Sequence, residues 1–203
     1  MISGVHADAF VEGPAAESPL QLRKAGMHDI RKILELINGY AALGIMLPRT
    51  ELEMSEVIRD FTVAMRGEEL FGCGALHFYS PAVGEIRSLA VSEKAKTRGV
   101  GRRLVEALVE EAQAFELDAV FAFTYVSEFF QKVGFHEVER GVLPLKVWKD
   151  CLRCPKFHSC DEVAVMRILR PAQWNESGRR PWAQPALSGE GEMFIQLPVP
   201  RKL

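Results

Sequence analysis

The sequence lacks both a long apolar run and an excess of charge of either sign. No window approaches the roughly 18 apolar residues that a membrane helix requires. The 203 residues include 25 Lys and Arg against 27 Asp and Glu, which gives a formal net charge of −2. This balance argues against a surface built for nucleic acid or for anionic membrane. Any anion-binding site is therefore expected to be local.

Cysteine is scarce, and the first residues do not resemble a secretory signal. Residues 1–19 carry neither a basic segment nor a sustained apolar run, so export is not predicted. The cysteines are therefore expected to be reduced thiols or metal ligands, with no disulfide; they are Cys73, Cys151, Cys154 and Cys160. The sequence predicts a cytoplasmic protein without a nucleic-acid or membrane partner. The oligomeric state stays open, with a homodimer among the options.

Alternating periodicities predict one α/β (α+β) domain between two loosely built ends. Residues 1–19 are expected to be a flexible leader, residues 20–170 the domain, and residues 171–203 a Pro- and Gly-rich tail. Apolar patterns predict strands at 20–25, 61–65, 70–78, 85–91, 119–124 and 163–169. Helical spacing predicts helices at 28–42, 55–60 and 102–115, and a short one ended by Gly134.

A basic turn with two glycines stands between a predicted strand and the clearest predicted helix. Unpaired N–H groups at a helix start attract anions, and glycines let an anion approach those amides closely. Lys96, Arg98 and Arg102 add full positive charges. A Walker A loop is excluded because two arginines follow Gly101, and the dinucleotide fingerprint lacks its third glycine. The turn is predicted to bind phosphate, most naturally a pyrophosphate; a connection with solvated charges is the alternative.

Two motifs resemble the signatures of the GNAT superfamily of N-acyltransferases. Residues 96–101, Lys-Thr-Arg-Gly-Val-Gly, resemble the pyrophosphate loop Gln/Arg-x-x-Gly-x-Gly/Ala, although a lysine opens the motif here. Residues 129–135, Phe-Phe-Gln-Lys-Val-Gly-Phe, match a second signature that ends in Gly-Phe. The resemblance implies a single GNAT-type domain, with a mixed twisted sheet that is flanked by helices and contains a splayed central pair of strands.

The resemblance also implies acetyl-CoA as the co-substrate and assigns residues to it. The implied cofactor contacts are Leu89, Ala90, Val91, Lys96, Thr97, Arg98, Gly99, Val100, Gly101, Arg102 and Phe130. Phe130 stands where many members carry a tyrosine that protonates the departing thiolate. Thr124 or Tyr125 is expected to substitute for it, or the thiolate leaves unaided; Thr124 could also hydrogen-bond the attacking amine.

Glu85 begins the strand that leads into the phosphate loop, and the resemblance implies that it is the general base. An α-ammonium group has a reference pKa of about 8, so a base or a water relay is needed at neutral pH. An exposed carboxylate at a strand end, with no catalytic role, is the alternative.

Longer stretches are similar to the short-form N-acetylglutamate synthases, which catalyse the first step of arginine biosynthesis. These stretches are 37–50, 72–91, 123–135 and 143–167. The similarity implies L-glutamate as the acceptor. Guanidinium groups bind carboxylates in bidentate fashion, so Arg49 and Arg87 are expected to hold glutamate, with a backbone contact from Ser88. A surface arginine and a structural ion pair are the alternatives.

The four residues Cys151, Cys154, His158 and Cys160 have a spacing that suits a tetrahedral Cys3His zinc site. Such a zinc would be structural, and a loop of packed or free thiols is the alternative.

Other function classes also stay open. The same fold could acetylate another amino acid or a protein N-terminus, or it could bind acyl-CoA without catalysis. A nucleic-acid module is disfavoured by the net charge.

Overall fold

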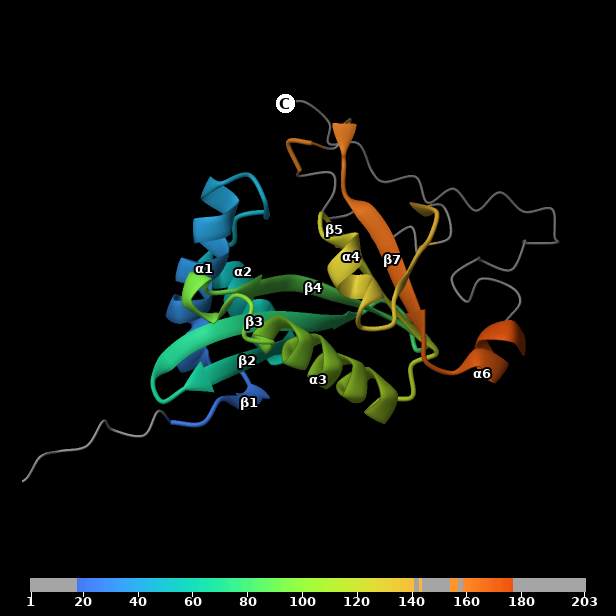
Figure 1. The fold of residues 1–203 in the computed structure, drawn as a ribbon, viewed down its shortest axis with the longest axis horizontal. Coiled ribbons are helices and arrows are strands. Elements are labelled where there is room, and N and C mark those ends of the chain that lie inside the picture. The colour runs from blue at the N-terminus through green and yellow to red at the C-terminus, as the bar shows by residue number, and fades with distance from the viewer. Residues whose placement is uncertain (1–17, 141–142, 144–153, 157–158, 177–203) are drawn as a thin grey trace, which may run out of the picture.

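The structure, a computed structural model, describes residues 18–140, 143, 154–156 and 159–176. Within these residues seven strands form one mixed sheet, and helices cover both of its faces (Figure 1). The prediction of an α/β domain with a mixed sheet flanked by helices is confirmed.

The strands are β1 (Gln21–Lys24), β2 (Phe61–Arg66), β3 (Glu69–Phe78), β4 (Val83–Val91), β5 (Ala119–Thr124), β6 (His136–Glu137) and β7 (Val163–Ile168). The α-helices are α1 (Ile30–Ala42), α2 (Glu51–Val57), α3 (Val100–Ala114), α4 (Ser127–Gln131) and α6 (Pro171–Glu176). Short 3₁₀ helices, η1 to η3, lie at Met27–Asp29, Ile58–Asp60 and Glu93–Ala95.

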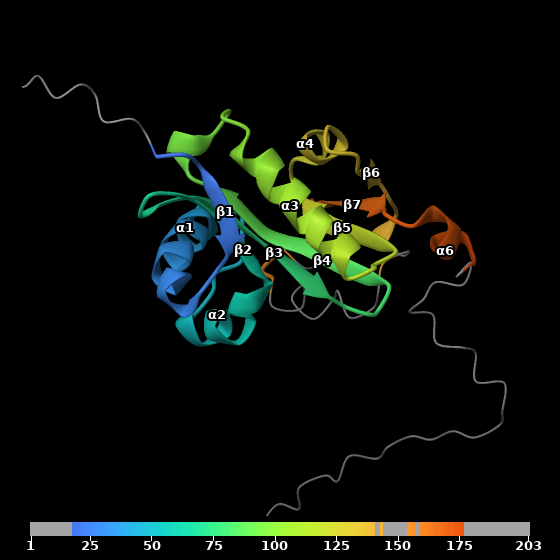
Figure 2. The same ribbon diagram turned by 90° about the horizontal axis from the view of Figure 1, so that it is seen from below.

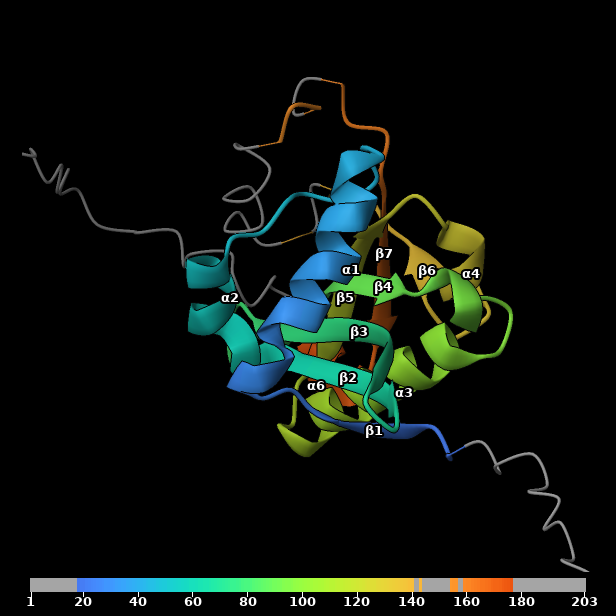
Figure 3. The same cartoon turned by 90° about the vertical axis from the view of Figure 1, so that its left-hand side faces the viewer.

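The strand order is β1-β2-β3-β4-β5-β7-β6. The first four strands are antiparallel neighbours and lie side by side in Figure 3. β4 and β5 are parallel, with α3 as their crossover, and β7 pairs antiparallel with both β5 and β6. This parallel pair therefore lies in the middle of the sheet.

The central strands β4 and β5 pair over only three residues each. Their register runs from Val83↔Ala119 to Glu85↔Phe121 and stops there. Beyond this point β4 stays paired with β3, and β5 stays paired with β7 as far as Thr124. The two strands therefore separate toward their carboxyl ends, which confirms the predicted splayed pair.

A β-bulge interrupts β4 just after the point of separation. Cys73 pairs with Ala90 and Ala75 pairs with Arg87, so two residues of β4, Ser88 and Leu89, lie opposite one residue of β3. Ser88 has a φ of +52°, in the left-handed region that most residues avoid. The bulge changes the direction of β4 where β5 no longer pairs with it.

The two faces of the sheet carry different helices, as Figure 2 shows. Ile33 and Ile37 of α1 pack with Val63 in one buried cluster, which also includes residues of α2. The neighbouring Ala64 packs on the other face with Leu104 of α3. Because adjacent strand residues point to opposite faces, α1 and α2 cover one face and α3 covers the other.

Close approach of α3 depends on Gly72 of β3. A Cβ atom at this position would lie 2.9 Å from the Ala90 carbonyl oxygen and 3.0 Å from Leu104 Cδ1. Both distances are too short for ordinary van der Waals contact. The absence of a side chain at Gly72 therefore lets α3 and β4 pack tightly together at the start of α3.

Element boundaries differ from the predictions where local capping decides them. α2 begins at Glu51 and not at Ser55, because Thr50 and Glu53 form a reciprocal capping box. α3 begins at Val100, two residues earlier than predicted, because Gly99 adopts φ +75° and acts as its N-cap. β6 and α6 were not predicted. β6 has two residues, too few for a recognisable alternation.

Parts of the predicted ends lie outside the described residues, namely 1–17 of the leader and 177–203 of the tail. α6 places helical structure in the first residues of the predicted tail. None of the helices in the described ranges combines the length and the apolar composition needed to span a membrane.

Candidate active site

Glu85 lies where the two central strands separate. It occupies the last rung of the β4–β5 pairing, opposite Phe121. Its side chain is buried, with 8% of the residue exposed, so it is not the exposed carboxylate of the alternative interpretation. The Tyr79 hydroxyl donates a hydrogen bond of 3.0 Å to Glu85 Oε2. A buried carboxylate at an opening in the sheet is a suitable place for proton transfer.

Further charged groups surround Glu85 on the same face of the sheet. His77 lies directly opposite Glu85 in the β3–β4 register, and its Nδ1 is 2.8 Å from Asp60 Oδ2. The pairing is regular from Glu85 to Arg87, so alternation places Arg87 on this face too. Ala75, the partner of Arg87, packs in the cluster under α1 and α2. The acid and the arginine therefore share the face that these helices cover.

The predicted backbone contacts for the thioester arm lie in the part of β4 beyond the pairing with β5. Leu89 packs against the clusters on the α3 face, whereas Ala90 is buried on the α1 face. The Val91 carbonyl accepts a hydrogen bond of 2.6 Å from the Tyr40 hydroxyl. Tyr40 was not predicted as a site residue, because it reaches β4 from the end of α1, far away in the sequence.

The basic loop leads directly into the N-terminus of α3. Thr97 and Gly99 both have positive φ, of 63° and 75°, and helix N–H groups begin at Val100. Left-handed residues in a turn before a helix direct neighbouring backbone N–H groups toward one side, a geometry that suits an anion. The structure therefore has the local geometry that the phosphate prediction needs.

The cations of this loop differ in how far their charge is already balanced. Lys96 Nζ lies 2.6 Å from Glu93 Oε1, and this hydrogen bond raises the pKa of Lys96. Arg102 Nε lies 2.7 Å from Glu106 Oε1. Within the described ranges Arg98 forms no ion pair. Arg98 is thus the cation of the loop whose charge is most available to a phosphate.

The structure places Phe130 in the core. The residue is 3% exposed, and its ring centroid lies 5.3 Å from that of Phe129 and 5.2 Å from that of Phe135. Phe129 instead borders the basic loop, because a Cβ atom at Gly101 would lie 3.4 Å from Phe129 Cζ. The motif predicted an aromatic residue near the loop, but it did not show which of the two neighbours faces it.

Thr124 ends β5 beside the opening, and Tyr125 follows it. Thr124 is buried, and its Oγ1 accepts a hydrogen bond of 3.0 Å from the Val126 N–H. Burial raises the pKa of Tyr125, and Lys156 Nζ lies 3.4 Å from its hydroxyl oxygen. The phenol is therefore protonated at neutral pH, and the raised pKa makes it a weaker acid than an exposed tyrosine.

Arg49 lies in the connection between α1 and α2. Its backbone is fixed by Asn38, whose Oδ1 accepts from Arg49 N–H at 2.9 Å and whose Nδ2 donates to the Arg49 carbonyl at 3.0 Å. The residue is half-buried. This pair of bonds fixes the start of the side chain beside the N-cap of α2.

The zinc prediction gains no support. Cys151 and His158 lie outside the described residues, and Cys154 and Cys160 are free thiols. The described part of the chain contains no group of three or more His, Cys, Asp or Glu residues that could hold a metal ion. Cys73 is fully buried in the core, where desolvation raises the pKa of its thiol to about 12.

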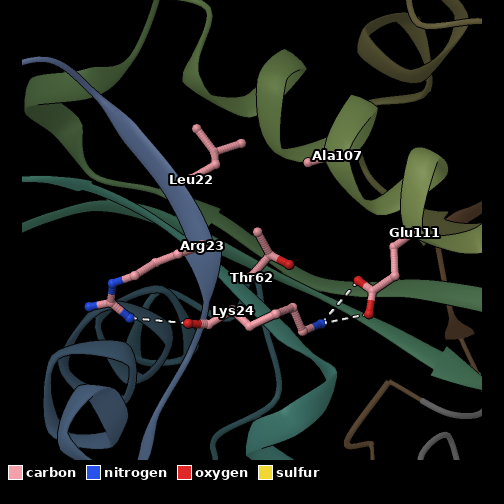
Figure 4. Close-up of a pocket in the computed structure, with 6 residues that line it drawn as sticks. All are labelled: Leu22, Arg23, Lys24, Thr62, Ala107 and Glu111. Carbon is pink, nitrogen blue, oxygen red and sulfur yellow. Dashed lines mark hydrogen bonds and ion pairs between the residues drawn. The ribbon is translucent and has the colours of Figure 1, made fainter.

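A hollow of about 340 Å³ lies away from these residues, between β1 and α3 (Figure 4). It is lined by Leu22, Arg23, Lys24, Thr62, Ala107 and Glu111. The ion pair between Lys24 Nζ and Glu111 Oε1, at 2.8 Å, lies on one side of it. None of the predicted site residues lines the hollow, so we do not assign it to the active site.

Comparison with known proteins identifies the family. Residues 29–137 match the acetyltransferase (GNAT) family. The chain belongs to the acetyltransferase (GNAT) family. The predictions of a single GNAT domain and of an N-acetyltransferase are confirmed.

Among the relatives is an uncharacterized N-acetyltransferase of Chlorobaculum tepidum, 40% identical over 77% of this GNAT chain and 99% of its own length. An amino-acid acetyltransferase of Mycobacterium tuberculosis is 32% identical over 65% of this chain and 77% of its own. One from Neisseria meningitidis is 33% identical over 67% of this chain, which spans only 32% of that longer protein.

Solved structures are similar as well. N-acetylglutamate synthase from Neisseria gonorrhoeae, complexed with coenzyme A and N-acetyl-glutamate, superposes with a TM-score of 0.68 at 29% identity; the match covers 76% of this GNAT chain and 36% of that one. A Mycobacterium tuberculosis protein in complex with CoA superposes with a TM-score of 0.63 at 27% identity, over 73% of this chain and 99% of that one.

Proposed function

We propose that the protein transfers the acetyl group of acetyl-CoA to the α-amino group of L-glutamate, the reaction that begins arginine biosynthesis. The observation that carries the proposal is the buried carboxylate of Glu85 at the opening between β4 and β5, with Arg87 on the same face. The relatives named amino-acid acetyltransferase, and the structural neighbour bound to coenzyme A and N-acetyl-glutamate, support an amino-acid acceptor.

Binding of acetyl-CoA is assigned to the loop at the start of α3 and to β4 beyond Glu85. Backbone N–H groups of residues 97–101 would hold the pyrophosphate, and Arg98 would supply charge to it. The backbone of residues 89–91 would hold the thioester arm, along the edge that β5 leaves unpaired. Phe129, beside Gly101, would contact the same arm.

Acetyl transfer from the bound thioester then needs an oriented amine and a route for the protons that the amine loses. Glu85 takes one proton from the ammonium group, directly or through water, and the neutral amine attacks the thioester carbon. The C–N bond forms, the C–S bond breaks, and coenzyme A leaves as a thiolate. The nitrogen gives up its second excess proton as the amide forms, and one proton reaches the sulfur through Tyr125 or water, which takes up the proton from the nitrogen in exchange. Thr124 at the end of β5 holds the amine.

Recognition of glutamate is assigned to two arginines from different elements. Arg87 lies two residues from Glu85 on β4, and Arg49 precedes α2. Two guanidinium groups match the two carboxylates of the acceptor, and each can bind one carboxylate with two hydrogen bonds. Ser88, at the bulge, would add a backbone contact.

A panel of free amino acids tests this proposal, with acetyl-CoA and the purified full chain and with released thiol as the readout. L-glutamate should react with the highest kcat/KM. Arg49→Ala should reduce kcat/KM for glutamate by about 100-fold, while KM for acetyl-CoA stays within about twofold. Turnover of a different amino acid, or of a peptide N-terminus, without turnover of glutamate would show that the acceptor is wrong. Binding of coenzyme A with no thiol release for any acceptor would show a non-catalytic domain.

A further inference from the structure

Tyr79 lies directly against the proposed base, although it was not among the predicted site residues. Its hydroxyl donates to Glu85 Oε2 at 3.0 Å. It follows the last residue of β3 and opens the turn into β4, on which Glu85 lies. The turn that joins the two strands therefore brings the phenol back over the carboxylate.

The turn is fixed by its own hydrogen bonds. Tyr79 N–H donates to the Val83 carbonyl at 3.0 Å. Ser80 Oγ accepts from the N–H groups of Ala82 and Val83, at 3.2 and 3.1 Å. A side-chain oxygen that satisfies two turn amides restricts the backbone conformations of the loop. The backbone of Tyr79 is thus held in place.

The ring of Tyr79 is fixed by two aromatic neighbours. The His77 ring meets it at an angle of 87°, with centroids 5.1 Å apart. Phe121, the residue paired with Glu85 on β5, lies 5.7 Å from it between centroids. Aromatic pairs at such separations are stabilising, so the ring has a defined position. The fixed ring in turn fixes the position of its hydroxyl beside Glu85.

Among the described residues, the neighbours of Glu85 on each adjoining strand can be named. From β3, His77 lies opposite it and is paired with Asp60 of the 3₁₀ helix before β2. From its own strand, Arg87 shares its face, and from β5 the neighbour is the apolar Phe121. From the turn after β3, Tyr79 donates a hydrogen bond to Glu85.

We propose that Tyr79 is a positioning residue, whose hydroxyl holds the Glu85 carboxylate ionised and oriented toward the attacking amine. This inference rests on the proposed function, in which Glu85 is the base. A hydrogen bond to the charged form of a carboxyl group favours that form, and burial disfavours it. Tyr79 therefore offsets the burial of Glu85 and keeps the base active at neutral pH.

The test is Tyr79→Phe in the full chain, a change that keeps the ring and removes the hydroxyl. The pH profile of kcat/KM for the acceptor is measured together with KM for acetyl-CoA. The acid limb should move to higher pH by about one unit, because the ionised carboxylate loses a donor. At the plateau kcat should fall on the order of fivefold to tenfold, with KM for acetyl-CoA within about twofold.

A second variant should shift the acid limb of the pH profile in the opposite direction. Site-specific 3-fluorotyrosine at position 79 keeps the hydroxyl and makes it a stronger donor, so the acid limb should move to lower pH. A merely structural role of the ring would leave the limb in place in both proteins. If the pH profiles of the wild type, Tyr79→Phe and the 3-fluorotyrosine protein coincide, the inference is overturned. The 3-fluorotyrosine protein also tests the inference if Tyr79→Phe does not fold.

The double variant separates this inference from the proposed base. Glu85→Gln should lower kcat by at least about 100-fold, and adding Tyr79→Phe to it should change nothing further. If Glu85→Gln is inactive but Tyr79→Phe behaves as wild type, the base stands and the inference is wrong. If Glu85→Gln turns over normally, the proposed base is wrong. Equal losses from Tyr79→Phe in both backgrounds would show a structural role only.

Discussion

Lys96 and Glu93 form an ion pair of 2.6 Å between Nζ and Oε1 in the loop that leads to α3. The same carboxylate also lies 3.4 Å from the Tyr40 hydroxyl, and the Lys96 ammonium lies over the Tyr40 ring at 5.5 Å. The loop is thereby tied to the end of α1. The consequence is that Lys96 has a partner before any phosphate binds.

Removal of Arg98 should therefore weaken binding of coenzyme A more than removal of Lys96. Arg98 is exposed and forms no ion pair in the described ranges, so its charge is not already balanced by a carboxylate there. We expect Arg98→Ala to raise the Kd for coenzyme A about tenfold and Lys96→Ala about twofold to threefold, measured by calorimetry. Arg31→Ala, on the exposed surface of α1, is the control and should change nothing. The reverse order of the two losses would contradict this assignment.

Gly72→Ala should destabilise the protein and impair its use of acetyl-CoA. The new Cβ would meet a backbone atom, the Ala90 carbonyl oxygen, at 2.9 Å, and backbone moves less easily than a side chain. We expect a loss of about 1–3 kcal/mol in the free energy of unfolding by urea, and a higher KM for acetyl-CoA because β4 shifts. Gly39→Ala in α1 is the matched control. Its Cβ would have no neighbour within 4 Å, so it should stabilise the helix by about 0.5–1 kcal/mol.

Local patterns were sufficient to predict most of the elements and the two motifs. Leu104 and Leu108 at helical spacing predicted α3, and the apolar run 119–124 predicted β5 with the bounds that the structure has. Such signals depend on residues that are neighbours in sequence. The same holds for the loop at 96–101, where glycines and cations adjoin.

Contacts between distant residues were beyond the reach of the sequence. Tyr40 reaches Val91 from another element, and the bulge at Ser88 depends on how β3 pairs with β4. Phe130 was placed at the cofactor by its position in a motif, yet Phe129 is the neighbour that faces the loop. Helix orientation and strand register decide these outcomes, and both are set by tertiary packing.

Stability at acid pH should depend on Asp29. This buried carboxylate accepts from Arg23 Nη1 at 2.7 Å, from Nη2 at 2.9 Å and from the Gly26 N–H at 2.8 Å. The Arg23 hydrogen bonds lower the pKa of Asp29 to about 2, below the usual value of 3.8. Because the folded-state pKa is the lower one, the stabilisation is fully present above about pH 5 and is lost as pH falls toward 2.

Urea unfolding between pH 7 and pH 2 measures this contribution. The wild type should lose about 2 kcal/mol from this group as the pH falls through that window. Asp29→Asn should be less stable at pH 7, and its free energy of unfolding should vary less below pH 5. Glu35→Gln, on the exposed face of α1, should leave the wild-type pH dependence intact. If the free energies of unfolding of Asp29→Asn and the wild type vary with pH in parallel, the Arg23–Asp29 ion pair is not the cause of the loss of stability at acid pH.

The bulge at Ser88 should be sensitive to the shape of the side chain and not to its polarity. Ser88 has φ +52°, a region that β-branched residues strongly disfavour, so Ser88→Val should destabilise the fold by about 1–2 kcal/mol. Ser88→Gly should be tolerated within about 1 kcal/mol, because the easier backbone geometry is offset by the greater entropy of the unfolded chain. Ser92→Val is the control, since Ser92 has an ordinary φ of −60°. In Ser88→Val the melting temperature should fall and KM for acetyl-CoA should rise, because flattening the bulge moves the backbone of residues 89–91. An equal melting temperature for Ser88→Val and Ser92→Val would show that the left-handed conformation is not required.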